Sequence, residues 1–252
     1  MSEIVSLQAI EKYTGQLLNA GLFRDYAPNG IQVDTDRPIR RLALAVTASL
    51  EAIDAAISWG ADALLVHHGY FWKGEDPRLI GPKWQRIRRL CAENVGLLAY
   101  HLPLDAHPEL GNNAQLAKLL GLQEDGRFGD QAIGWMGALP VPLSLTALGQ
   151  LVEAELGRMP ILVGERDRMV SRIGWCSGGA QGYVLDAAAA GCEVYLTGEA
   201  SERTYHDAVE NGIAFIAAGH DATERLGVQA LGAHLAAQFG LQVRFFASGN
   251  PF

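Results

Sequence analysis

An internal repeat is the feature that most constrains how this 252-residue chain can fold. A histidine followed four residues later by a carboxylate occurs twice, at His101 and Asp105 and again at His220 and Glu224. Twenty residues after each histidine the chain reads Gly-Leu-Gln, and alanine and leucine positions between the two landmarks also correspond. A repeat of this kind predicts two structural units of related architecture.

Strand-like and helix-like segments alternate in both halves of the chain, and Ser6 and Ser49 suit the N-caps of two of the helices. Strands are expected at residues 31–33, 42–46, 61–66, 95–100, 172–176, 192–196 and 213–217. Helices are expected at residues 6–19, 49–58, 82–91, 183–190 and 202–210. This order predicts an α/β fold, with mostly parallel sheets flanked by helices. We place the first unit at residues 1–127 and the second at residues 128–252, with residues 128–168 connecting the two.

Composition excludes several classes of function. The formal net charge is −8, and no run of basic residues is longer than two, which argues against an electrostatic nucleic-acid surface. The start of the chain lacks a basic region followed by an apolar stretch, and no apolar run approaches the ~20 residues of a membrane helix. Cys91, Cys176 and Cys192 have no Cys-x-x-Cys spacing and are expected to be buried, reduced thiols. We therefore predict a cytoplasmic protein with no membrane partner.

Histidines follow several of the expected strands. His67 and His68 come directly after the apolar run at residues 61–66, and His101 and His220 follow two further strands. In open α/β sheets, ligands bind beyond the carboxyl ends of the strands. Imidazole and carboxylate groups together are ligands of zinc, manganese and iron, and two ions ~3.5–4 Å apart form a common catalytic metal pair. The histidines at these strand ends, together with Asp105 and Glu224, therefore predict a metal site. A single histidine in such a place is more commonly a hydrogen-bonded loop residue, and either histidine–carboxylate pair alone fits a helix cap or an ion pair equally well.

Three other features have more than one interpretation each. The glycine-rich loop at residues 177–182 could hold a phosphate with its backbone N–H groups, or it could be a tight turn. Glu199 occupies the place that His68 holds in the first unit. It could orient a ligand, act as a general base, or be an ordinary loop charge. His206, in the following helix, could face solvent or the site.

Five motifs in this order carry a resemblance to a known family. They are Pro28-Asn29-Gly30-Ile31-Gln32-Val33, Leu65-Val66-His67-His68-Gly69, His101-Leu102-Pro103-Leu104-Asp105, Thr197-Gly198-Glu199 and Gly219-His220-Asp221-Ala222-Thr223-Glu224. Together they resemble the Nif-three-like (NGG-one-interacting-factor-like) family in its short bacterial form, often labelled GTP cyclohydrolase I type II homologs. The resemblance spans nearly the whole chain.

The resemblance implies two interlinked α/β domains, a dinuclear metal site in the cleft between them, and a hexameric ring. It allows the C-terminal segment to pack back on the first unit. Carried over motif by motif, the metal ligands are His67, His68, Asp105, His220 and Glu224. His101 is carried over as a sixth residue whose direct ligation the motif does not decide. The stretch from Gly198 to His206 also matches the short bacterial form, which implies that Glu199 and His206 line the cleft.

From these features we predict a hydrolase that uses two divalent ions (zinc, iron, manganese or magnesium) on a small nucleotide-like or phosphorylated substrate. Glu224 would bridge the ions, and Glu199 or His206 would move a proton. A second hypothesis is a non-catalytic, metal-dependent ligand-binding or regulatory ring protein. We do not adopt the cyclohydrolase label as the main function. The aromatic run Tyr70-Phe71-Trp72 predicts an exposed apolar surface, which is typical of an interface and favours a homo-oligomer.

Overall fold

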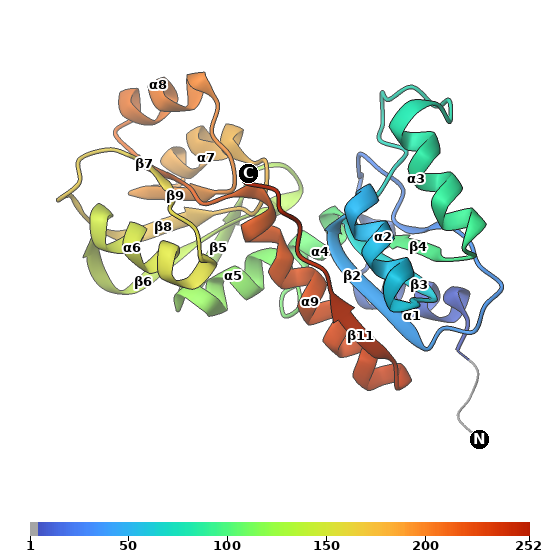
Figure 1. Cartoon of the computed structure of the whole chain (residues 1–252). Coiled ribbons are helices and arrows are strands. Elements are labelled where there is room, and N and C mark those ends of the chain that lie inside the picture. Colours follow the sequence, from blue (N-terminus) through green and yellow to red (C-terminus); the bar gives the residue numbers. More distant parts are fainter. Residues whose placement is uncertain (1–4) are drawn as a thin grey trace. The chain divides into compact units, whose positions relative to one another are not determined.

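The computed structural model describes residues 5–252; the first four residues, on which the expected lack of a secretory leader partly depends, lie outside it. Its contacts divide the chain into two units. Unit 1 comprises the chain up to Gly111 together with Gly227–Gly249, and unit 2 comprises Asn112–Leu226 and Asn250–Phe252. Figure 1 shows the helices and strands of each unit.

Unit 1 contains a five-stranded sheet in the order β1-β4-β3-β2-β11. Its strands are β1 (Gly30–Val33), β2 (Arg41–Thr47), β3 (Ala63–His68), β4 (Gly96–Ala99) and β11 (Gln242–Phe245). Its helices are α1 (Leu7–Leu17), η1 (Ala20–Leu22), α2 (Leu50–Trp59), α3 (Gly81–Ala92), α4 (Leu102–Ala106) and the later part of α9 (His220–Phe239). All neighbouring strands are parallel except β1, which pairs antiparallel with β4.

Both faces of this sheet are covered, which explains why its strands are apolar runs and not alternating patterns. On β2, Ala43 and Ala45 point into a core shared with α2 and α3. Leu42 and Leu44 point into the opposite core, shared with α1 and α9. The expected helix caps are present, because the Ser6 and Ser49 hydroxyls accept hydrogen bonds from the first turns of α1 and α2.

Unit 2 contains a six-stranded sheet in the order β5-β6-β8-β9-β10-β7. Its strands are β5 (Gln123–Phe128), β6 (Gly134–Ser144), β7 (Ile161–Val163), β8 (Met169–Trp175), β9 (Val194–Thr197) and β10 (Ala214–Ala217). Its helices are α5 (Asn112–Leu120), η2 (Asp130–Ala132), α6 (Leu145–Leu156), η3 (Gln181–Tyr183), α7 (Val184–Ala189), α8 (Glu202–Glu210) and the start of α9. The central strands β8, β9 and β10 are parallel, and the outer pairings are antiparallel. Helices α5 and α6 cover one face, while α7 and α8 lie on the other (Figure 1).

Residues 128–168 are more than the connection expected from the sequence, because they contain β6, α6 and β7 of the unit 2 sheet. The other expected helices and strands are present with ends shifted by a few residues.

Cys176 and Cys192 are buried as expected. The expectation was wrong for Cys91, which is exposed because α3 turns Ile87 and Leu90 toward the core instead. Among residues 5–252, no helix has the length and apolar character needed to cross a membrane.

The internal repeat is visible in one hydrogen-bonding pattern, in which a carboxylate just before one strand accepts two backbone N–H groups of the neighbouring strand. The Asp62 carboxylate, just before β3, accepts hydrogen bonds from the backbone N–H groups of Arg40 and Arg41 at the start of β2, both at 2.9 Å. Glu193, just before β9, accepts equivalent bonds at 2.6 and 2.9 Å from the backbone N–H groups of Ser171 and Arg172 in β8. The two units therefore share a local design, as the sequence predicted.

The helix and strand that follow each histidine–carboxylate motif belong to the opposite unit. His101 lies in unit 1, yet α5 and β5 after it are in unit 2. His220 lies in unit 2, yet the later part of α9 and β11 are in unit 1. The division therefore differs from a single boundary after residue 127. This exchange makes the two α/β units interlinked, and the expected fold class is confirmed.

Candidate metal centre

Unit 1 gathers three histidines at the carboxyl ends of two neighbouring strands. β3 ends at His67 and His68, and His101 follows β4 by two residues. Because β3 and β4 are parallel and adjacent, these ends meet at one edge of the sheet. One ring nitrogen from each histidine lies within 4.8 Å of the others, which is close enough for one ion. The sequence prediction that these residues come together is met within this unit.

His67 and His68 are neighbours in the chain, and their rings nevertheless lie 4.6 Å apart between centroids. Side chains on a regular strand point to opposite faces. Both residues belong to β3, so the two rings must approach each other through their side-chain torsions at the end of the strand. Gly69 follows them, and a Cβ on that residue would overlap the Gln32 amide and Ala99. The glycine is therefore required by close packing at the point where the histidine pair ends.

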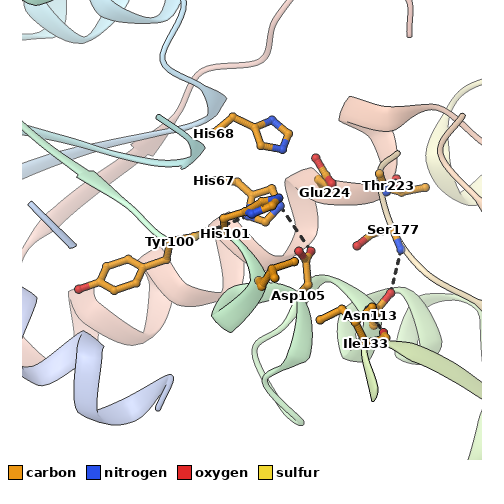
Figure 2. A network of polar contacts seen from close by, with 12 residues as sticks. His67, His68, Tyr100, His101, Asp105, Asn113, Ile133, Ser177, Thr223 and Glu224 are labelled. Atoms are coloured by element: carbon orange, nitrogen blue, oxygen red, sulfur yellow. Dashed lines mark hydrogen bonds and ion pairs between the residues drawn. The ribbon is translucent and has the colours of Figure 1, made fainter. Parts of the chain in front are cut away.

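The buried His67 ring is oriented by the backbone of Tyr100. Its Nδ1 lies 2.8 Å from the Tyr100 carbonyl oxygen, and a carbonyl can only accept, so Nδ1 carries the proton (Figure 2). In the neutral ring Nε2 then presents its lone pair, and this atom lies 3.4 Å from Oδ1 of the buried carboxylate of Asp105. A lone pair facing a carboxylate oxygen at this distance is repulsive unless a proton or a metal ion lies between them. The arrangement fits a metal ion.

The ring of His101 is held by Asp25, a residue that the sequence analysis missed. Asp25 Oδ1 lies 2.6 Å from His101 Nδ1, and only 4% of the Asp25 side chain is exposed. Burial raises the pKa of Asp25, but hydrogen bonds from His101 and Asn29 and the His101 charge together hold it below its usual value. The third orienting contact of the unit joins His68 Nδ1 to the Thr47 hydroxyl at 3.2 Å.

Unit 2 contributes a second histidine–carboxylate set at the start of α9. His220 begins the helix, and Glu224 lies one turn later, with His220 Nε2 3.0 Å from Glu224 Oε2. The opposite ring nitrogen, Nδ1, donates to Glu199 Oε1 at 2.6 Å. Burial lowers the pKa of His220, but the hydrogen bonds and charges of Glu224 and Glu199 outweigh it and raise this pKa to about 9. With this pKa, Nε2 would carry a proton at neutral pH unless an ion took its place.

Gly178, in the glycine-rich loop, lies directly against this pair. Its φ is +67°, and a Cβ at this position would overlap Glu224 Oε1 and approach His220 Nε2 to 3.0 Å. Only glycine therefore allows the loop to come this close to the two candidate ligands.

Several backbone N–H groups of the same loop donate hydrogen bonds to side chains within the protein. Ser177 donates to Asn113 Oδ1 at 2.9 Å (Figure 2), and Gly178 donates to the Thr223 hydroxyl at 3.0 Å. Ala180 donates to a threonine hydroxyl as well. These three groups are not available to a phosphate, so the tight-turn interpretation fits the loop better.

The two candidate proton-transfer residues have different surroundings. Glu199 lies beside His220, and 42% of its side chain is exposed. His206 lies on α8, where it is 58% exposed and its Nε2 is 3.2 Å from Glu202 Oε1. The structure brings Glu199 to a candidate ligand, whereas the partner of His206 is a surface carboxylate on its own helix.

Comparison with known proteins identifies the family. Residues 5–251 match the model of the family described as Duf34/NIF3 (NGG1p interacting factor 3). The chain belongs to this family. It is 49% identical over 241 residues to the GTP cyclohydrolase 1 type 2 homolog of Allochromatium vinosum, covering 95% of both chains. It is 45% identical over 243 residues to the protein of the same name from Escherichia coli K12, covering 96% of this chain and 98% of the relative.

Solved structures of related proteins support the same assignment to Duf34/NIF3. The protein ybgI, described as of unknown function, superposes with a TM-score of 0.94 at 43% identity and covers 98% of this chain and 100% of its own. TTHA1606 from Thermus thermophilus superposes with a TM-score of 0.89 at 32% identity, with the same coverage. The recognition made from five short motifs is thereby confirmed.

Proposed function

We propose that this Duf34/NIF3 protein binds two divalent metal ions and uses them to hydrolyse a small substrate. The proposed ligands are His67, His68, His101 and Asp105 of unit 1 and His220 and Glu224 of unit 2. The observation that carries the proposal is shared by all four histidines: each engages its Nδ1 in a hydrogen bond. Metal-ligating histidines characteristically use one nitrogen in this way and bind the ion with the other.

The chemistry of these donors supports a particular choice of ion. Nitrogen from imidazole combined with carboxylate oxygen suits zinc, iron or manganese better than magnesium, which prefers oxygen ligands alone. Six donors exceed the four of a tetrahedral zinc site, which supports two ions instead of one. Bound divalent ions lower the pKa of water toward neutrality and polarise an electrophilic carbon or phosphorus centre.

Glu199 is the residue we propose to move a proton during hydrolysis. One of its oxygens accepts from His220, and its exposed fraction gives the carboxylate access to solvent. A carboxylate that touches both a ligand and water can accept a proton near the reaction centre and release it. His206 is the second candidate for proton transfer from the sequence, and its role is tested in the same activity assay.

The activity test is a panel of nucleotides, phosphoesters and cyclic amides offered to metal-loaded protein; GTP is included because the relatives' names mention it. We expect saturable turnover of one class, reduced about 10²–10⁴-fold by Glu199→Gln. Glu210→Gln, at the exposed end of α8, is the matched control and should keep full activity. A His206→Gln variant measured alongside tests that residue.

Tight binding of a panel compound without turnover would support the alternative, a non-catalytic metal-dependent ligand-binding or regulatory protein. No turnover and no binding in any class would contradict the hydrolase proposal for these substrates.

We also propose that the protein is a homo-oligomer, in keeping with the hexameric ring that the family resemblance implies. The aromatic run offers less exposed surface than expected, because Tyr70 is buried with its hydroxyl bonded to the Ala48 carbonyl. Phe71 remains 38% exposed, and Tyr26 and Trp84 are exposed as well. Light scattering at micromolar concentration should give a mass several-fold above 27.1 kDa. A monomer mass would exclude the ring while leaving the metal proposal intact.

A further inference from the structure

We propose that Asp25 is a positioning residue that fixes His101 as a direct metal ligand. The inference rests on the proposed metal binding and extends it to a residue outside the family motifs quoted above. It also decides the role of His101, which the motif alone left open.

The Asp25 carboxylate holds His101 by both its side chain and the adjacent backbone. Oδ1 accepts the Nδ1 proton of the ring at 2.6 Å. Oδ2 accepts the backbone N–H of Leu102, the first residue of α4, at 2.9 Å. One carboxylate therefore sets the ring orientation and the start of the helix that carries Asp105.

Asp25 is itself held rigidly. Oδ1 also accepts the Tyr26 backbone N–H at 2.6 Å, and Oδ2 accepts the Asn29 amide at 2.8 Å. The Asn29 side-chain oxygen in turn accepts the backbone N–H of His101 at 2.8 Å. Asp25, Asn29 and His101 thus form a closed set of hydrogen bonds, in which each oxygen of the buried carboxylate has two donors.

This set determines which nitrogen of His101 can bind an ion. With Nδ1–H directed at Asp25, the lone pair lies on Nε2. The ring also lies close to the other two histidines, with centroids 5.1 Å from His67 and 5.7 Å from His68. A carboxylate on Nδ1–H also makes the imidazole a more basic ligand.

The contrast with Glu199 separates positioning from proton transfer. Both carboxylates bind a histidine Nδ1 at 2.6 Å. Asp25 is 4% exposed and saturated with donors, whereas Glu199 is 42% exposed. Asp25 is therefore placed to orient its histidine, whereas the Glu199 carboxylate is far more accessible to solvent.

The test measures Zn²⁺ affinity by chelator competition in the wild type and in Asp25→Asn, which removes the charge while keeping the shape. We expect the affinity for one of the ions to fall about 10–100-fold. The control is Asp54→Asn, which removes the same charge from an exposed carboxylate that pairs with Arg89 at 2.7 Å. This control should bind Zn²⁺ as the wild type does.

A double-mutant cycle distinguishes a positioning role from a merely structural one. In a His101→Ala background, Asp25→Asn should cause a much smaller further loss of Zn²⁺ affinity, because the ring that it orients is gone and only its contact with the start of α4 remains. An equal loss with and without His101, or an unchanged affinity in Asp25→Asn, would overturn the inference. If Asp25→Asn does not fold, Asn29→Ala takes its place in the same cycle, with a smaller expected loss. A wild-type protein that binds none of Zn²⁺, Mn²⁺ and Fe²⁺ would instead refute the proposed function, and this inference with it.

Discussion

We expect the purified protein to hold about two divalent ions per chain, and Glu224→Gln to lose most of both. A bridging carboxylate offers one oxygen to each ion, while a neutral amide is a poor ligand for either. His67→Ala should lose mainly one ion, because an imidazole has a single lone pair to donate. Elemental analysis of protein kept away from chelators measures all three contents.

The control for this experiment is Glu165→Gln, which makes the same chemical change on an exposed loop and should keep both ions. The opposite pattern, in which the His67 variant loses two ions and the Glu224 variant one, would place the bridge at another residue. A wild-type content near zero, with no uptake on soaking, would remove the basis of the metal proposal.

Much of the fold could be predicted because local physical chemistry determines it. The run Leu42–Val46 is apolar throughout since β2 has a core on both faces. The elements that were missed carry weaker patterns. β5 consists largely of exposed and half-buried polar residues, and β11 alternates exposed with half-buried ones. Their pairing in the opposite unit is a long-range property that no local pattern encodes.

The candidate ligands could be predicted for a different reason. Strand ends collect at one edge of a parallel sheet, so histidines after successive strands converge whatever the loops do. The spacing of His220 and Glu224 also predicted a shared helical face, which their 3.0 Å contact confirms. Asp25 could not be found in this way, because it is 76 residues from His101 and lies outside any expected helix or strand.

Gly178→Ala should disable the unit 2 ligand pair. The added methyl group would overlap Glu224 Oε1, and the backbone at φ +67° disfavours any side chain by about 1–2 kcal/mol. Glu224 is 3% exposed and has little room to move aside. We therefore expect a loss of at least one ion per chain and a free energy of unfolding lower by about 1–2 kcal/mol in the presence of chelator. Elemental analysis and denaturant unfolding measure the two effects.

Gly182→Ala is the matched control in the same loop, because a Cβ there meets no atom within 4 Å and its φ is not positive. It should keep its metal and its stability. If Gly178→Ala were destabilised but held both ions, Glu224 would have to leave the loop when metal binds, and the metal-free contact would not be the binding geometry. If instead it lost metal without losing stability, the methyl group would act on the carboxylate alone. The two measurements together therefore show whether the close approach of Gly178 serves the ligand pair, the loop, or both.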